Sequence, residues 1–153
     1  KPRTSFSVMR YCLITLFICL FAGSLGAAEF RSVAEDAAVL YDAPSLKAQK
    51  LYLLGRDYPL EVVVVLENWI KVRDANGELA WVEKKSLSDK RSVMVNVPLA
   101  DVRQAPNDSA APVFQAGQSV LLELVEFSDP GWIKVRHRDG QTGYVRVNQV
   151  WGG

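Results

Sequence analysis

The 153-residue sequence predicts an all-β fold, in which two tandem small β-barrels of about five strands each follow an N-terminal signal helix. The first observation is a repeat: the pentapeptide Trp-Ile-Lys-Val-Arg stands at residues 69–73 and again, 63 residues later, at residues 132–136. In each copy a Gly turn and an aromatic-Val pair follow at matching positions, so we expect two copies of one structural unit. The second observation is that no segment after residue 28 sustains a helical period.

Residues 1–28 have the composition of a secretory signal peptide. Basic residues within the first ten positions precede an almost wholly apolar stretch at residues 11–22, and small residues lead to an expected cleavage site after Ala28. An uncleaved membrane anchor is the competing interpretation, but about a dozen strongly apolar residues fall short of the roughly 20 that a spanning helix needs. We therefore expect a periplasmic or secreted protein, with no stable membrane insertion after signal cleavage.

The exported part is expected to form a first domain at residues 29–88 and a second at residues 91–153. The offset between the copies rises from 62 to 63 in the loop before the repeated Trp, which places one extra residue in the Pro-Gly loop of the second copy. The few residues between the copies are polar and predict a tight linker. Each unit is near the size at which one core is only marginally stabilising, so we expect the copies to pack against each other.

Composition excludes several classes of function. Without residues 1–28, 15 basic and 17 acidic side chains remain, and this near-neutral balance disfavours nucleic acid as a partner. Both cysteines, Cys12 and Cys19, lie in the predicted signal peptide. The mature chain is therefore expected to have no disulfide and no cysteine chemistry.

Strand and turn patterns alternate through each copy. Residues 58–66 and 120–127 are rich in Val, Leu and aromatic residues and favour strands. Asn76-Gly77 and Asp139-Gly140 predict tight two-residue hairpin turns with two positive φ angles. The best helical candidate after the signal is the short segment 33–40.

The order of these features resembles the bacterial SH3 (Src-homology 3) domain family. In both copies an early strand with a Leu/Val-x-x-x-Pro element is followed by a mid-domain Gly, the Trp-Ile-Lys-Val-Arg strand, a Gly turn and a closing Leu or Val. The resemblance covers residues 35–151 and implies two SH3-like barrels. One departure is that the second copy keeps the Val102-Arg103 pair common in the family, whereas the first has Leu40-Tyr41.

Strand alternation separates the core from the surface in the repeated strand. Ile70 and Val72 share one face, while Trp69, Lys71 and Arg73 share the other. Unpaired Lys and Arg do not fit in a core, so we expect Ile70 and Val72 to point inward, and the repeated tryptophans to lie on the wetter face. In the next strand we expect Val82 and Val145 inside and the preceding aromatic residues outside.

Two aromatic residues per copy are thus expected to form one patch for an extended ligand. The candidate ligand-binding residues are Tyr41, Trp69, Trp81, Arg103, Trp132 and Tyr144. The competing interpretation is that the repeated tryptophans cover a barrel end or pack between the copies.

Other polar residues point to structure rather than chemistry. Glu61 and Glu123 repeat on strands and are expected to pair across a sheet with the repeated Lys or Arg. His137, the single histidine, lies beside a turn and makes a poor metal site without cysteine. We expect no catalytic residue, no metal and no cofactor.

Three classes of function remain at this point. The first is an exported non-catalytic binding module that recognises a peptidoglycan peptide or an envelope protein, as the resemblance implies. The second is a cell-wall enzyme, which loses its chemistry because the mature chain lacks cysteine. The third is a scaffold whose two barrels pack together or assemble without a small ligand.

Overall fold

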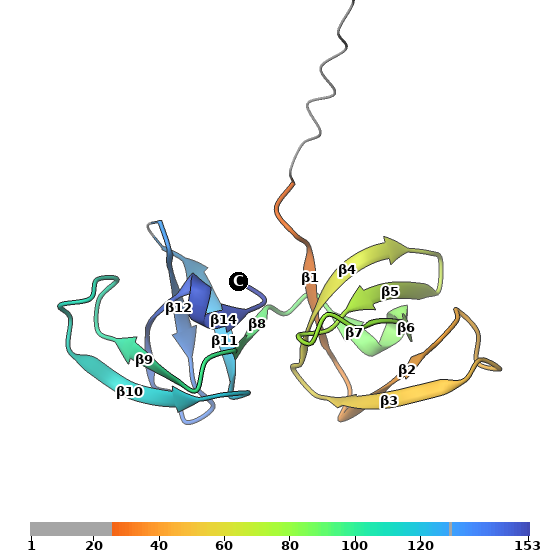
Figure 1. Ribbon diagram of the computed structural model, residues 1–153, viewed down its shortest axis with the longest axis horizontal. Helices are drawn as coiled ribbons and strands as arrows, with labels where there is room; N and C mark the ends of the chain where they lie inside the picture. The colour runs from red at the N-terminus through yellow and green to blue at the C-terminus, as the bar shows by residue number, and fades with distance from the viewer. Residues whose placement is uncertain (1–25, 129) are drawn as a thin grey trace, which may run out of the picture.

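The computed structural model describes residues 26–128 and 130–153, which form two β-rich lobes side by side (Figure 1). Each lobe is one seven-stranded antiparallel sheet curled around its own core. The strand orders are β3-β2-β6-β5-β4-β1-β7 and β10-β9-β13-β12-β11-β8-β14, so the second sheet repeats the topology of the first. The predicted all-β duplication is confirmed, whereas the predicted signal helix lies, apart from residues 26–28, outside the described residues.

The first barrel is built from seven short strands and one 3-10 turn. They are β1 (Phe30–Val33), β2 (Ala37–Tyr41), β3 (Lys50–Gly55), β4 (Pro59–Val65), β5 (Trp69–Arg73), β6 (Leu79–Glu83), η1 (Lys84–Ser86) and β7 (Leu87–Ser88). The second barrel has the same sequence of elements. They are β8 (Ser92–Val95), β9 (Leu99–Arg103), β10 (Pro112–Gly117), β11 (Leu121–Phe127), β12 (Trp132–Arg136), β13 (Thr142–Arg146), η2 (Val147–Gln149) and β14 (Val150–Trp151).

The strand count differs from the expected five because each sheet gains two short strands at one edge. In the first barrel β1 pairs with both β4 and the two-residue β7. Segment 33–40, the best helical candidate in the sequence, is instead divided between the end of β1 and most of β2. Val33 at the end of β1 reaches the core, as do Ala38 and Leu40, which alternate along β2.

The repeated strand supplies the centre of each core, as its alternation predicts. Ile70 and Val72 are fully buried in the first barrel, and Ile133 and Val135 in the second. Burying such side chains contributes roughly 1.5 to 3 kcal/mol each.

The Gly turns differ in detail from the expected two-residue form. Gly77 has φ 87°, and it is preceded by Asn76 with an ordinary negative φ. The backbone N–H of Asp74 donates to the carbonyl of Glu78, so three residues form the loop. This is the geometry of a type I turn closed by a left-handed Gly, for which one positive φ suffices.

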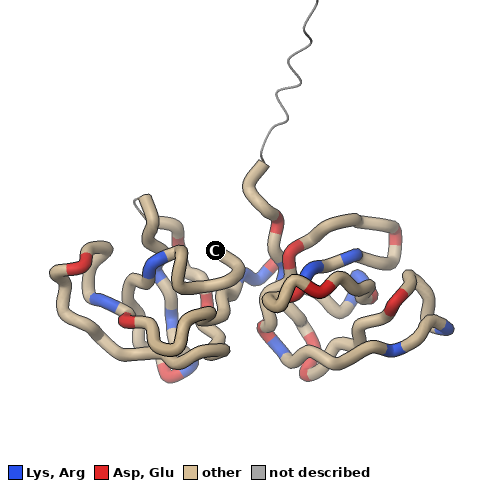
Figure 2. Tube along the Cα trace, in the orientation of Figure 1, with Lys and Arg blue, Asp and Glu red and all other residues tan. Residues whose placement is uncertain are grey.

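The repeated glutamates pair with the repeated arginines across the sheet. Glu61 lies opposite Arg73 with an N–O distance of 2.8 Å, and Glu123 lies opposite Arg136 at 3.5 Å. The prediction of a cross-strand pair is confirmed, with Arg and not Lys as the partner. Figure 2 shows acidic and basic positions interspersed along both barrels.

The two barrels contact each other directly, as their small size predicts. The ring of Phe30 packs edge-on against Trp151, with centroids 5.1 Å apart, and the indole N–H of Trp151 donates to the carbonyl of Pro59 at 3.1 Å. The Arg91 guanidinium lies 5.5 Å from the Phe30 ring and donates to the carbonyl of Gly152 at 2.7 Å. Burial in this contact lowers the pKa of Arg91.

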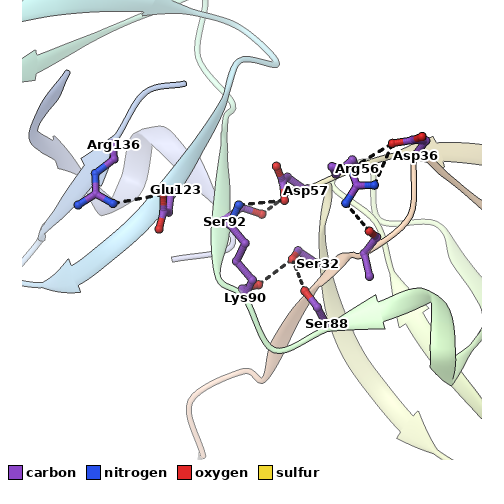
Figure 3. Close-up of polar contacts among 10 residues, drawn as sticks. Ser32, Asp36, Arg56, Asp57, Ser88, Lys90, Ser92, Glu123 and Arg136 are labelled. Carbon is purple, nitrogen blue, oxygen red and sulfur yellow. Dashed lines mark hydrogen bonds and ion pairs between the residues drawn. The ribbon is translucent and has the colours of Figure 1, made fainter. Parts of the chain in front are cut away.

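The linker takes part in the same contact (Figure 3). The Ser92 hydroxyl donates to the carbonyl of Asp57, whose carboxylate lies 3.3 Å from the ammonium of Lys90. The Ser32 hydroxyl donates to the carbonyl of Lys90 at 2.7 Å. The linker is therefore held against the first barrel on both sides. Over the described ranges, no helix is long and apolar enough to span a membrane.

Candidate functional site

The outer face of the first barrel carries a row of side chains across four strands. Tyr41 of β2 lies opposite Trp81 of β6, Trp81 opposite Lys71 of β5, and Lys71 opposite Val64 of β4. Residues directly opposite one another in antiparallel strands place their side chains on the same side of the sheet. We call this row, together with Trp69, face 1.

Face 1 is aromatic and partly open to solvent. Tyr41 meets Trp69 edge-on with ring centroids 5.3 Å apart and planes at 88°. The Lys71 ammonium lies 5.9 Å from the centroid of the Trp81 ring. Both tryptophans are half-buried, and Val64 at the end of the row is 40% exposed. An aromatic surface of this kind offers stacking and apolar contact to a ligand lying across the strands.

The second barrel has the same row with different chemistry, which we call face 2. Arg103 lies opposite Tyr144, Tyr144 opposite Lys134, and Lys134 opposite Glu126. Lys134 lies 5.9 Å from the Tyr144 ring, as Lys71 does from Trp81. The ends of the row, however, have changed from aromatic and apolar side chains to charged ones.

Trp132 lies on the outer side of the sheet, as alternation predicts, but the expectation that this side chain is exposed to water was wrong. Its side chain is buried, with 7% of its surface exposed, because the Arg146 guanidinium lies 4.7 Å from the centroid of its ring. Arg146 is directly opposite Trp132 in the β12–β13 pair, and its Nε donates to the Asp108 carboxylate at 3.0 Å. Alternation correctly put Trp132 outside the core, but an arginine from the next strand covers it.

Arg103 and Tyr41 occupy the same position in the two copies but make different contacts. Tyr41 is 5% exposed and packs on Trp69. Arg103 turns back to its own hairpin, where it donates to the carbonyl of Ala110 at 2.8 Å and to the carboxylate of Asp101 at 3.1 Å. The six predicted residues therefore form two groups of three, one on each barrel.

Sequence reasoning missed the residues that make the two faces unlike. Glu83 lies opposite Trp69, where the second copy has Arg146 opposite Trp132. The residue across the hairpin from the tryptophan also differs. The backbone N–H of Leu66 donates to the carbonyl of Trp69, whereas that of Ser128 donates to the carbonyl of Trp132. Aligning the two copies at an offset of 63 would have found this difference, because Glu83 in the first copy aligns with Arg146 in the second.

A second pair of contacting residues, beside the Gly turn, also differs between the two copies. In the first barrel the Tyr52 hydroxyl donates to the carboxylate of Asp74 at 2.9 Å, and burial together with this bond raises the pKa of Tyr52. In the second barrel the corresponding residues are Phe114 and His137, whose rings are 5.6 Å apart. This contact gives His137 a packing role.

The described residues show no metal centre. Between residues 26–128 and 130–153, no group of three or more metal-ligating side chains is placed to hold an ion. The main difference between the two barrels is that Trp69 is half-buried on the first, whereas Trp132 is covered on the second.

The fold and its duplicated aromatic rows define a pair of small barrels of the SH3 class. The bacterial SH3 domain family matches the sequence twice, over residues 34–89 and 96–152, and the chain belongs to this family. Domains of this family are generally binding modules.

Comparison with solved structures finds NlpC/P60-type proteins. NlpC2 from Trichomonas vaginalis is 17% identical with a TM-score of 0.37, covering 82% of this chain and 48% of its own. NlpC1 from the same organism is 17% identical with a TM-score of 0.38, over 84% of this chain and 47% of its own. An NlpC/P60 family protein from Bacillus cereus is 16% identical with a TM-score of 0.36, over 80% and 55%. The chain thus spans about half the length of these proteins, and no curated protein matches it.

Proposed function

We propose that this protein is an exported, non-catalytic binding module that recognises peptides of the cell wall or of an envelope protein. The observation that carries the proposal is the open state of face 1. Two half-buried tryptophans and Val64, which is 40% exposed, line it. Leu66, whose backbone N–H donates to the carbonyl of Trp69, adds a leucine that is 43% exposed at its edge. Contiguous exposed aromatic and apolar side chains are typical of binding surfaces. The predicted signal peptide supports a periplasmic or secreted location.

The position of face 1 in the sheet also supports this function. Face 1 lies on β2, β6, β5 and β4, whereas β1, the start of β4 and the linker meet the second barrel. Trp69 and Trp81 are in none of the interdomain contacts found among the described residues. Packing of the barrels therefore leaves this surface free for a ligand.

Co-sedimentation with purified, protein-free sacculi tests the proposal. We expect the chain to sediment with sacculi at low salt. Trp81→Ala should weaken this binding by roughly 1 to 4 kcal/mol, the range of interface hot spots. Tyr144→Ala, at the matching position of face 2, is the control and should bind as the unchanged protein does. If the unchanged protein stays in the supernatant, wall peptides are not its ligand, and envelope proteins become the class to test.

The alternative function is a scaffold whose barrels pack together without a small ligand. The contact of Phe30 with Trp151 favours it, because it shows that the barrels do pack. Under this alternative, Trp69→Ala and Trp81→Ala would leave all binding unchanged, and Trp151→Ala would disrupt the assembly.

A further inference from the structure

The two repeated tryptophans have neighbours of opposite charge. Trp132 lies opposite Arg146, and Trp69 lies opposite Glu83, in the same register of the same strand pair. Because directly opposed side chains in an antiparallel pair lie about 5 Å apart, each charge stands beside its indole ring. The second copy thus pairs its tryptophan with a cation, and the first with an anion.

In the second barrel the cation occupies the aromatic site. The Arg146 guanidinium lies 4.7 Å from the Trp132 ring centroid and bonds to the Asp108 carboxylate, so it has both an aromatic face and a carboxylate as partners. This is the arrangement in which a cation gains most from an indole ring, because the ring face is electron-rich. The tryptophan beneath it is 7% exposed.

The first barrel arranges its indole and carboxylate differently, because Glu83 stands at the position of Arg146 and Leu46 at that of Asp108. Among residues 26–128 and 130–153, no cation lies over the Trp69 ring. Glu83 supplies the carboxylate, Trp69 the indole, and Tyr41 a second ring packed edge-on against the indole at 5.3 Å. A carboxylate does not stack on the negative face of an aromatic ring, so Glu83 leaves Trp69 half-buried where Arg146 buries Trp132.

Glu83 is half-buried, with 26% of its side chain exposed, and among the described residues only a weak ion pair competes for its carboxylate. Lys85 lies 3.4 Å from its carboxylate, but the lysine side chain is 74% exposed, and exposed pairs of this kind are weak. The ammonium of Lys71 lies over the ring of Trp81. Glu67 is exposed on the loop before Trp69, and a hollow of about 360 Å³ is lined by Glu67, Asn68, Glu83, Lys84 and Lys85.

We propose that face 1 binds a cationic group of its ligand, an alkylammonium or a guanidinium, between the Trp69 ring and the Glu83 carboxylate. Arg146 shows, within the same chain, that a guanidinium can lie against this repeated tryptophan. The proposal rests on the proposed function and narrows its ligand to peptides that carry a free amine or guanidinium.

A matched pair of peptides tests this assignment. The probes are Ac-Ala-Lys-Ala-NH2 and Ac-Ala-norleucine-Ala-NH2, which differ in the ammonium group and are titrated while the indole N–H resonance of Trp69 is followed. We expect the lysine peptide to bind about threefold to tenfold tighter, which is the range for a cation on an exposed ring beside a carboxylate. Added salt should reduce this preference.

Three variants distinguish recognition of the charge from non-specific apolar binding. Glu83→Gln keeps the size of a half-buried side chain and should abolish the preference for lysine while leaving norleucine binding unchanged. Glu83→Arg copies the second barrel and should weaken both peptides by covering Trp69. Lys85→Ala removes a competing ammonium and should strengthen lysine binding by about twofold.

The failure of this proposal differs from the failure of the proposed function. Equal affinity for both peptides, or a lysine preference that survives Glu83→Gln, overturns the cation site while sacculus binding through Trp81 still stands. Absence of binding by both peptides, together with no co-sedimentation with sacculi, overturns both.

Discussion

Trp151 of the second barrel packs edge-on against Phe30 of the first, with ring centroids 5.1 Å apart and ring planes at 85°. The first copy has Ser88 at the position of Trp151, so this joint is a property of the second copy alone. Its indole also donates to the carbonyl of Pro59, which gives one side chain an apolar and a polar anchor on the other barrel.

Trp151→Ala should let the barrels move independently. The variant loses an aromatic pair worth about 0.5 to 1.5 kcal/mol and a hydrogen bond of about the same net value. Nitrogen-15 relaxation should then give the barrels shorter and unequal rotational correlation times. Trp81→Ala, a change of the same size away from the joint, serves as control. A single unchanged correlation time in Trp151→Ala would contradict the role of this contact.

Arg146→Ala should uncover Trp132. The indole N–H of Trp132 is expected to exchange faster with solvent, and the free energy of unfolding of the second barrel to fall by about 1 kcal/mol, the loss of one cation–π contact and one exposed ion pair. Two-dimensional NMR of the four indole groups resolves the effect. Arg138→Ala, which changes an exposed arginine in the turn after β12, is the comparison, and equal shifts in both variants would speak against the cap.

Val135→Ala should open a cavity in the second core. Val135 is fully buried, so the truncation is expected to lower the free energy of unfolding by roughly 1 to 3 kcal/mol. Lys134→Ala, one residue away on the outer face, should change it by less than about 0.5 kcal/mol. Urea denaturation of both variants measures the difference. Because Trp132 is buried, Trp132→Ala should also destabilise the barrel.

Alkaline pH should destabilise the first barrel through Tyr52. Burial and the bond to Asp74 raise the pKa of Tyr52 in the folded state, whereas the unfolded chain loses this proton near pH 10. Below pH 10 the contribution of Tyr52 to stability is fully present, and it declines as pH rises above that value because only the unfolded state has then released the proton. Tyr52→Phe should flatten this decline, measured by thermal unfolding across the alkaline range. An equally steep decline in the variant would place its origin elsewhere.

Duplication made most of the fold predictable. Alternation in the repeated strand identified Ile70, Val72 and their counterparts as core, and the structure buries all four. The short edge strands were missed because two residues such as those of β7 carry too little periodicity to stand out. The turn at Gly77 was placed correctly but given one positive φ too many, since an Asn-Gly pair fits two loop geometries.

The sequence predicted which side of the sheet each candidate residue occupies, but not which residues of the adjacent strand lie beside it. Alternation locates a side chain on a face, but exposure depends on what the adjacent strand places beside it. Trp69 and Trp132 have identical local sequence, and they differ because one lies opposite Glu83 and the other opposite Arg146. The register between two strands depends on how the chain folds, so it cannot be derived from the sequence of one strand alone.

Each copy has its own pair of contacting residues beside the Gly turn, Tyr52 and Asp74 in the first and Phe114 and His137 in the second. A recombination that joined one half of the first copy to the other half of the second would set Phe114 beside Asp74, and the carboxylate would lose its phenol donor. The reciprocal product would set Tyr52 beside His137. We therefore expect each hybrid domain to be less stable than the copy that keeps its own pair.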